Sequence, residues 1–162
     1  MKNVLWVDCC IRGEESRTLR LSRAFLDALP QDCAVTHLDL MQLQPRYFFG
    51  DYLEERQKLL EQGNLSHPRF DLAHQFAAAD EIVVSAPFWD LSFPALLKVY
   101  IEQVSLDGIT FASTEAGLVG RCRAERMVYL TTRGGFYTGD ELEMGSRYMQ
   151  ALCKFFGIDR YD

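Results

Sequence analysis

The sequence lacks the short motifs by which several large protein classes are recognised. Its 162 residues contain no C-x-x-C, no G-x-G-x-x-G after the first apolar run and no G-x-x-x-x-G-K-S/T. These absences disfavour a dinucleotide-binding fold and a nucleotide hydrolase. Five cysteines, an odd number that includes the adjacent Cys9 and Cys10, predict neither a disulfide framework nor a zinc site. A reducing cytoplasm suits such thiols best.

Long apolar runs and clusters of positive charge are also missing. No apolar run approaches the ~20 residues that a membrane span needs, so we expect no membrane partner. The net charge is −6 and no basic cluster is present, so we expect no nucleic acid. The N-terminus enters an apolar stretch almost at once, and we expect no signal peptide. The three histidines have no companions at metal-ligand spacing, and we expect no metal.

Apolar runs alternate with amphipathic stretches, which predicts one α/β domain over residues 1–162. Strands are expected at residues 4–7, 35–40, 82–86 and 127–130. Helices are expected at about residues 17–29, 51–63, 70–79, 94–108 and 141–156. Apolar strands between helices favour a parallel sheet covered on both faces. Right-handed crossovers then favour a flavodoxin-like three-layer sandwich with strand order 2-1-3-4-5.

The end of the sequence fits this strand order poorly. Only residues 158–162 follow Gly157, where a fifth strand and a last helix belong. We therefore expect either a sheet of four strands or a shortened version of a longer chain, with the fifth strand missing.

An aromatic loop in the middle of the chain is the most informative motif. Its sequence is Pro87-Phe88-Trp89-Asp90-Leu91, and it follows the apolar run at 82–86. It therefore lies at the carboxyl end of a central strand, where open α/β sheets bind ligands. The next apolar run leads into a second loop, Thr131-Thr132-Arg133-Gly134-Gly135, whose glycines allow a close backbone approach. We interpret the two loops as a cradle for a flavin ring; the alternative is core aromatics beside an ordinary turn.

A third segment, Ser16-Arg17-Thr18, lies where the first loop becomes the first helix. The unpaired amides and partial positive charge of a helix N-terminus favour a phosphate. Hydroxyl groups and the arginine would add to that binding. Cys9 and Cys10 follow the first strand directly and are expected close to the same place. The alternative is that Ser16 is an ordinary helix cap.

Together these segments resemble the flavodoxin-like NAD(P)H-dependent oxidoreductases, the family of FMN-dependent azoreductases and NAD(P)H quinone reductases. The central segment carries most of the resemblance, from Ala86-Pro87-Phe88-Trp89-Asp90-Leu91 to Leu97-Lys98-Val99-Tyr100. Asp107-Gly108-Ile109-Thr110-Phe111 is also similar to a stretch of the azoreductases. The resemblance extends from residue 1 to about residue 158.

The resemblance implies non-covalent FMN, NADH or NADPH as cosubstrate, and ping-pong hydride transfer to a quinone or azo-type electron acceptor. It also implies a homodimer with the active site at the subunit interface. The residues that would hold the cofactor are Cys9, Ser16, Arg17, Thr18, Pro87, Phe88, Trp89, Asp90, Leu91, Thr132, Arg133, Gly134 and Gly135. Two of them depart from the family, which commonly has serine at Cys9 and asparagine or tryptophan at Asp90.

Three points stay open at this stage. Tyr137 is a candidate contact of the acceptor or of the reduced ring, and a structural role for it is equally consistent. A one-electron carrier of the flavodoxin type is an alternative function, although the Thr/Ser-rich loop directly after strand one is missing. A flavin-free binding module is the other alternative.

Overall fold

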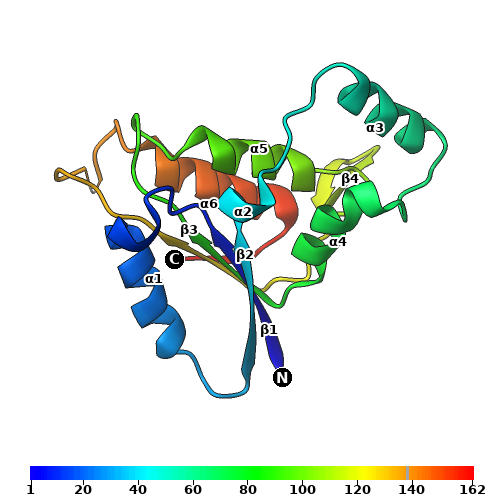
Figure 1. Ribbon diagram of the computed structural model, residues 1–162. Helices are drawn as coiled ribbons and strands as arrows, with labels where there is room; N and C mark the ends of the chain where they lie inside the picture. The colour runs from blue at the N-terminus through cyan, green and yellow to red at the C-terminus, as the bar shows by residue number, and fades with distance from the viewer. Residues whose placement is uncertain (138) are drawn as a thin grey trace.

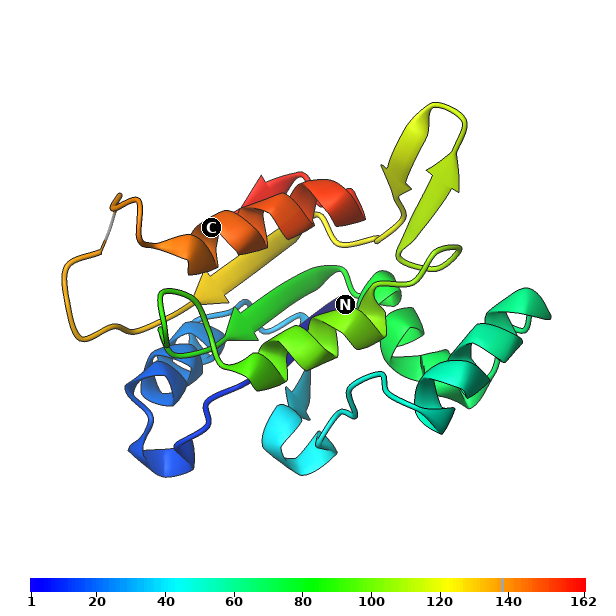
Figure 2. The same ribbon diagram turned by 90° about the horizontal axis from the view of Figure 1, so that it is seen from above.

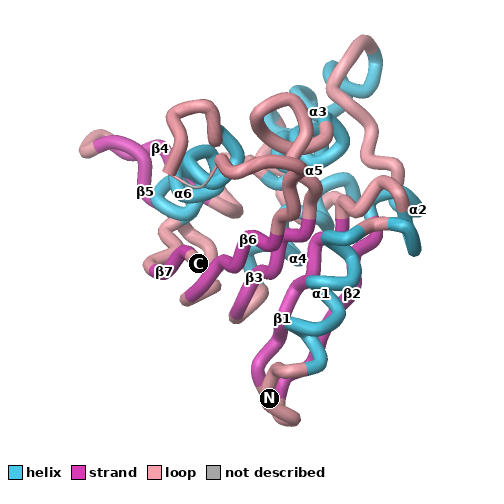
Figure 3. Tube along the Cα trace, turned by 90° about the vertical axis from the view of Figure 1, so that its left-hand side faces the viewer, coloured by secondary structure: helices cyan, strands magenta, loops and turns pink. Residues whose placement is uncertain are grey.

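A parallel sheet forms the centre of the protein, whose computed structural model describes residues 1–137 and 139–162 (Figure 1). In spatial order its strands are β2 (Cys33–Asp39), β1 (Lys2–Asp8), β3 (Glu81–Ser85), β6 (Arg126–Leu130) and β7 (Arg160–Tyr161). All neighbouring strands pair in parallel, and Figure 3 shows them side by side in this order. The expected strand order is therefore confirmed, with β6 and β7 as the fourth and fifth strands.

The fifth strand corrects the expectation of a missing strand. Arg160 and Tyr161 pair with Arg126 and Met127 of β6. The pairing continues beyond β7, because the Tyr129 amide donates to the Asp162 carbonyl at 2.8 Å. A strand of two residues has no apolar pattern of its own, so only its backbone pairing reveals it.

Helices cover both faces of the sheet because successive strand residues point to opposite sides. On one face α1 (Arg17–Asp27) packs its Leu19 into a cluster with Trp6 and Val83 of the strands. The other face carries α4 (Asp71–Ala78), α5 (Ala95–Val104) and α6 (Met144–Phe156), whose buried side chains form the larger core cluster. Figure 1 shows α1 on the opposite side of the sheet from α5 and α6.

The remaining elements lie at the edges of this sandwich. Two single 3-10 turns occur at Gly13–Glu15 and Pro68–Phe70, and two further helices are α2 (Leu40–Leu43) and α3 (Asp51–Glu61). An antiparallel hairpin of β4 (Phe111–Thr114) and β5 (Gly117–Gly120) was not expected from the sequence. Figure 2 shows this hairpin and α3 at the end of the molecule away from the loop that precedes α6. No helix in the described part of the chain is both long enough and apolar enough to span a bilayer.

Candidate functional site

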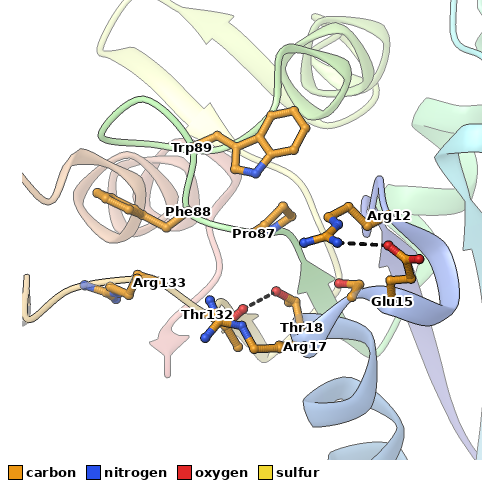
Figure 4. Close-up of a pocket in the computed structure, with 11 residues that line it drawn as sticks. Arg12, Glu15, Arg17, Thr18, Pro87, Phe88, Trp89, Thr132 and Arg133 are labelled. Atoms are coloured by element: carbon orange, nitrogen blue, oxygen red, sulfur yellow. Dashed lines mark hydrogen bonds and ion pairs between the residues drawn. The ribbon is translucent and has the colours of Figure 1, made fainter.

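Three loops meet at the carboxyl edge of the sheet and form a cavity of about 120 Å³ (Figure 4). They follow β1, β3 and β6, the three neighbouring central strands. The residues that line the cavity are Arg12, Glu15, Ser16, Arg17, Thr18, Pro87, Phe88, Trp89, Thr132, Arg133 and Gly134. The structure thus brings together the three segments that the sequence analysis singled out.

Some candidate residues lie outside this lining. Cys9 is fully buried in the core, and burial raises the pKa of its thiol to about 12. Gly135 lies against the Tyr137 ring, which a Cβ at this glycine would approach to 2.9 Å. Asp90 and Leu91 are exposed at the tip of their loop. Contact of these residues with a cofactor stays a prediction.

The shape of the loop after β3 explains why Asp90 and Leu91 are exposed. The amides of Trp89 and Ser92 donate to each other's carbonyls at 3.2 and 2.8 Å, which closes a two-residue hairpin. Its central residues, Asp90 and Leu91, have φ values of +47° and +67°, as in a type I′ turn. Left-handed backbone costs a non-glycine residue about 1–2 kcal/mol. The amide of Met144, the first residue of α6, donates to the Leu91 carbonyl at 2.9 Å and helps to hold this turn.

The first turn of α1 presents unpaired amide donors at the cavity. The Ser16 hydroxyl accepts the Leu19 amide at 3.2 Å, so Ser16 is indeed the helix cap. Among the described residues, the Arg17 and Thr18 amides have no hydrogen-bond acceptor. Capping therefore leaves two donors at the positive end of the helix dipole for an anion.

The charges around the cavity favour an anion as well. Its lining contains three arginines and one glutamate. The Arg12 guanidinium pairs with the Glu15 carboxylate at 2.9 Å, while Arg17 has no carboxylate partner in the described part of the chain. Arg133 lies 4.0 Å from Glu143 and 5.5 Å from the centre of the Phe88 ring. The unbalanced positive charge favours an anionic ligand over a cationic one.

Hydrogen bonds join the first turn of α1 to the aromatic end of the cavity, which is formed by the loop after β3 (Pro87 to Leu91) and the loop after β6 (Thr131 to Gly135). The hydroxyls of Thr18 and Thr132 lie 2.7 Å apart (Figure 4). This pair has two protons and uses one internally, which leaves the other free for a ligand. The Phe88 amide donates to the Thr132 carbonyl at 3.1 Å and ties the two aromatic-end loops together. The ring centroids of Tyr137 and Phe88 lie 4.9 Å apart, and a contact of Tyr137 with an acceptor or a reduced ring stays a prediction.

Arg12 and Glu15 line the cavity but were not among the candidate residues. The 3-10 turn at Gly13–Glu15 folds the first loop back, and Gly13 takes a φ of +54°. A polar loop has no periodicity that predicts this fold. The only signal in the sequence is the opposite charge of two residues three positions apart.

These observations test whether a flavin mononucleotide suits the cavity. Its phosphate requires unpaired amides and positive charge, which the start of α1 and Arg17 provide. Its flat ring requires apolar walls and open backbone. Trp89 and Phe88 supply the walls, and a Cβ built on Gly134 meets no protein atom within 4 Å. The residues present fit the group.

The strand order and the helices on both faces of the sheet define a flavodoxin-like α/β protein, with a cavity at the carboxyl edge of the sheet. The sequence profile of the family described as "Flavodoxin-like fold" matches residues 2–162, and the chain belongs to that family.

Individual relatives match over nearly the whole chain. The FMN-dependent NADH:quinone oxidoreductase of Clostridium perfringens (strain SM101 / Type A) is 37% identical, covering 98% of this chain and 82% of the relative. The FMN-dependent NADH:quinone oxidoreductase 2 of Clostridium acetobutylicum is 36% identical, with the same coverage. Among solved structures, an azoreductase from Bacillus anthracis str. Sterne is similar, with a TM-score of 0.86 and 29% identity. This similarity covers 100% of the present chain and 85% of the azoreductase.

Proposed function

We propose that this protein is an FMN-dependent oxidoreductase that takes hydride from NADH and passes the electrons to a quinone or azo compound. The observation that carries the proposal is the joining of two unpaired helix amides and two aromatic-end loops in one cavity. The names of the similar proteins support the cofactor, the choice of NADH and both classes of acceptor.

The residues of the chain divide the work between binding and shielding. The Arg17 and Thr18 amides bind the phosphate, and the Arg17 guanidinium adds charge. Phe88 and Trp89 exclude water from one side of the ring, and the loop from Thr132 to Gly135 lies along its edge. When bound, FMN supplies a ring that accepts hydride and releases electrons in a second half-reaction. Cys9, Asp90 and Leu91 are further predicted contacts.

We also propose a homodimer with the site at the subunit interface, and a reducing cytoplasm as the location. Trp89, Leu91 and Phe136, in the loops at the aromatic end, are 42%, 41% and 107% exposed in the single chain. A second subunit would cover such an apolar surface. All five cysteines are free thiols, as a reducing compartment favours.

An absorption spectrum followed by anaerobic reduction tests the proposal. The protein, as purified or after incubation with FMN and removal of the unbound FMN, is expected to be yellow and to lose its colour with NADH. Addition of a benzoquinone is expected to restore the colour and to give steady turnover. A flavin-loaded protein that does not turn over would instead indicate a one-electron carrier. A protein that is colourless after incubation with FMN and removal of the unbound FMN would indicate a flavin-free binding module.

A further inference from the structure

A row of buried polar side chains runs under α1, behind the cavity. The Trp6 indole N–H donates to the Ser85 hydroxyl at 2.9 Å, and the Ser85 and Ser22 hydroxyls lie 2.7 Å apart. The Ser22 hydroxyl donates to the Thr18 carbonyl at 2.8 Å. Ser22, Ser85 and Thr18 are each 0% exposed. None of the three side chains of this row, Trp6, Ser85 and Ser22, lines the cavity.

The Ser22 hydroxyl links the two elements. An indole only donates, and each serine hydroxyl has one proton. The Ser85 hydroxyl accepts from the Trp6 indole, and the Ser22 hydroxyl is placed to donate its one proton to the Ser85 hydroxyl or to the Thr18 carbonyl. Because both acceptors lie within reach of one hydroxyl, the hydrogen-bond chain holds β3 and the first turn of α1 in one relative arrangement. Trp6 is itself held in place, because its ring stacks on His37 with centroids 3.9 Å apart.

The hydrogen-bond chain of Trp6, Ser85 and Ser22 connects two parts of the cavity that are distant in the sequence. Ser85 is the last residue of β3, and its carbonyl accepts the Cys9 amide of the first loop at 2.8 Å. Thr18 is the second residue of α1, and its amide is one of the two unpaired donors. A serine that bonds the carbonyl four residues earlier also bends the helix slightly at that point. The chain therefore sets the position of the first turn of α1 relative to the strand that leads into the aromatic loop.

We propose that Trp6, Ser85 and Ser22 are positioning residues that aim the α1 amides at the flavin phosphate. This inference rests on the proposed function, and it assigns the affinity for the phosphate to residues that do not touch the cofactor. Apolar side chains at these positions would stabilise the core without needing hydrogen-bond partners. A buried hydroxyl, in contrast, lowers the stability of the fold unless it is hydrogen-bonded. The polar chain is thus better explained by the one geometry that it specifies.

Riboflavin provides the test because it has the flavin ring without the phosphate. The dissociation constants of FMN and riboflavin are measured by calorimetry for the wild type, Ser22→Ala and Ser85→Ala. Each variant is expected to weaken FMN binding about fivefold to tenfold, the effect of one net hydrogen bond. Riboflavin binding is expected to change less than about twofold. Ser85→Ala also leaves the buried Trp6 indole N–H unpaired, so the melting temperatures of both variants are measured alongside.

Ser105→Ala is the matched control. The Ser105 hydroxyl donates to the Ile101 carbonyl at 2.8 Å, the same four-residue bond, at the end of α5 away from the aromatic loop. It is expected to leave both dissociation constants unchanged. The double variant Ser22→Ala/Ser85→Ala is expected to bind FMN no more weakly than the weaker single variant, because one chain is broken in each case.

The outcomes distinguish the positioning role of the hydrogen-bond chain from the phosphate site at α1. Equal losses for FMN and riboflavin, no loss for either, or additive losses in the double variant would overturn the positioning role. A wild type that binds FMN no more tightly than riboflavin would instead overturn the phosphate site itself. A wild type that binds neither flavin would overturn the proposed function.

Discussion

Replacing Ser16 with aspartate places a negative charge where the phosphate is expected to bind, while keeping the helix cap. Aspartate caps helices as well as serine does, so the bond to the Leu19 amide has a replacement. Ser16 is 5% exposed, so the effective dielectric constant lies below that of water. For unit charges about 5 Å apart, Coulomb's law gives about 0.8 kcal/mol in water and about 3.3 kcal/mol at an effective dielectric constant of 20. The FMN dissociation constant is therefore expected to rise about 4-fold to 250-fold.

Ser16→Asn is the control because asparagine has the shape and capping ability of aspartate without its charge. Flavin fluorescence quenching measures both dissociation constants at low and high salt. The aspartate variant is expected to bind FMN more weakly than the asparagine variant, with a smaller difference at high salt. Riboflavin is expected to bind both variants equally. Equal FMN affinities for the two variants would refute the placement of the phosphate at α1.

Three further predictions concern the ring loop, the fold and the thiols. Gly134→Ala is expected to weaken FMN binding by about 1–3 kcal/mol without lowering the melting temperature, because the added Cβ meets no protein atom within 4 Å. Calorimetry and a thermal melt measure the two effects, and a lowered melting temperature would contradict it. Gly120→Ala is expected to lower the free energy of unfolding by at least about 2 kcal/mol in urea, since its Cβ would lie 2.0 Å from the Gly157 nitrogen. Unchanged stability would refute this close contact. Burial raises the pKa of the Cys9 thiol from 9.0 to about 12. As the pH rises, this thiol therefore loses its proton at a lower pH in the unfolded protein than in the folded protein. Stability is then expected to fall between pH 9 and 12 by up to about 1.4 kcal/mol per pH unit, and to fall less steeply in Cys9→Ala. An equal slope in urea titrations of both proteins would count against that pKa.

The central strands could be predicted because burial on both faces selects apolar side chains. β3 is buried at every position, and Ile82, Val83 and Val84 are an unmistakable apolar run. The fifth strand could not be predicted in this way. Arg160 and Tyr161 are held by backbone pairing to β6, which does not depend on their side chains. The hairpin from Phe111 to Gly120 was hidden for a related reason, because its strands are half-buried or exposed.

The cavity could be predicted in outline, because parallel strands bring their following loops to one edge of the sheet. The positions of four residues around the cavity depend on turn geometry, which the sequence did not predict. Asp90 and Leu91 adopt left-handed backbone although neither is a glycine, so the sequence does not predict their turn. The turn places both residues at the exposed tip of the loop. Arg12 and Glu15 reach the cavity through a 3-10 turn in a loop without periodicity.

A crystal structure of the protein with bound FMN tests the central claim most directly. The phosphate is expected within hydrogen-bond distance of the Arg17 and Thr18 amides, with the ring between the loop from Pro87 to Leu91 and the loop from Thr132 to Gly135. A phosphate bound away from the first turn of α1, or a ring outside these two loops, would contradict the account.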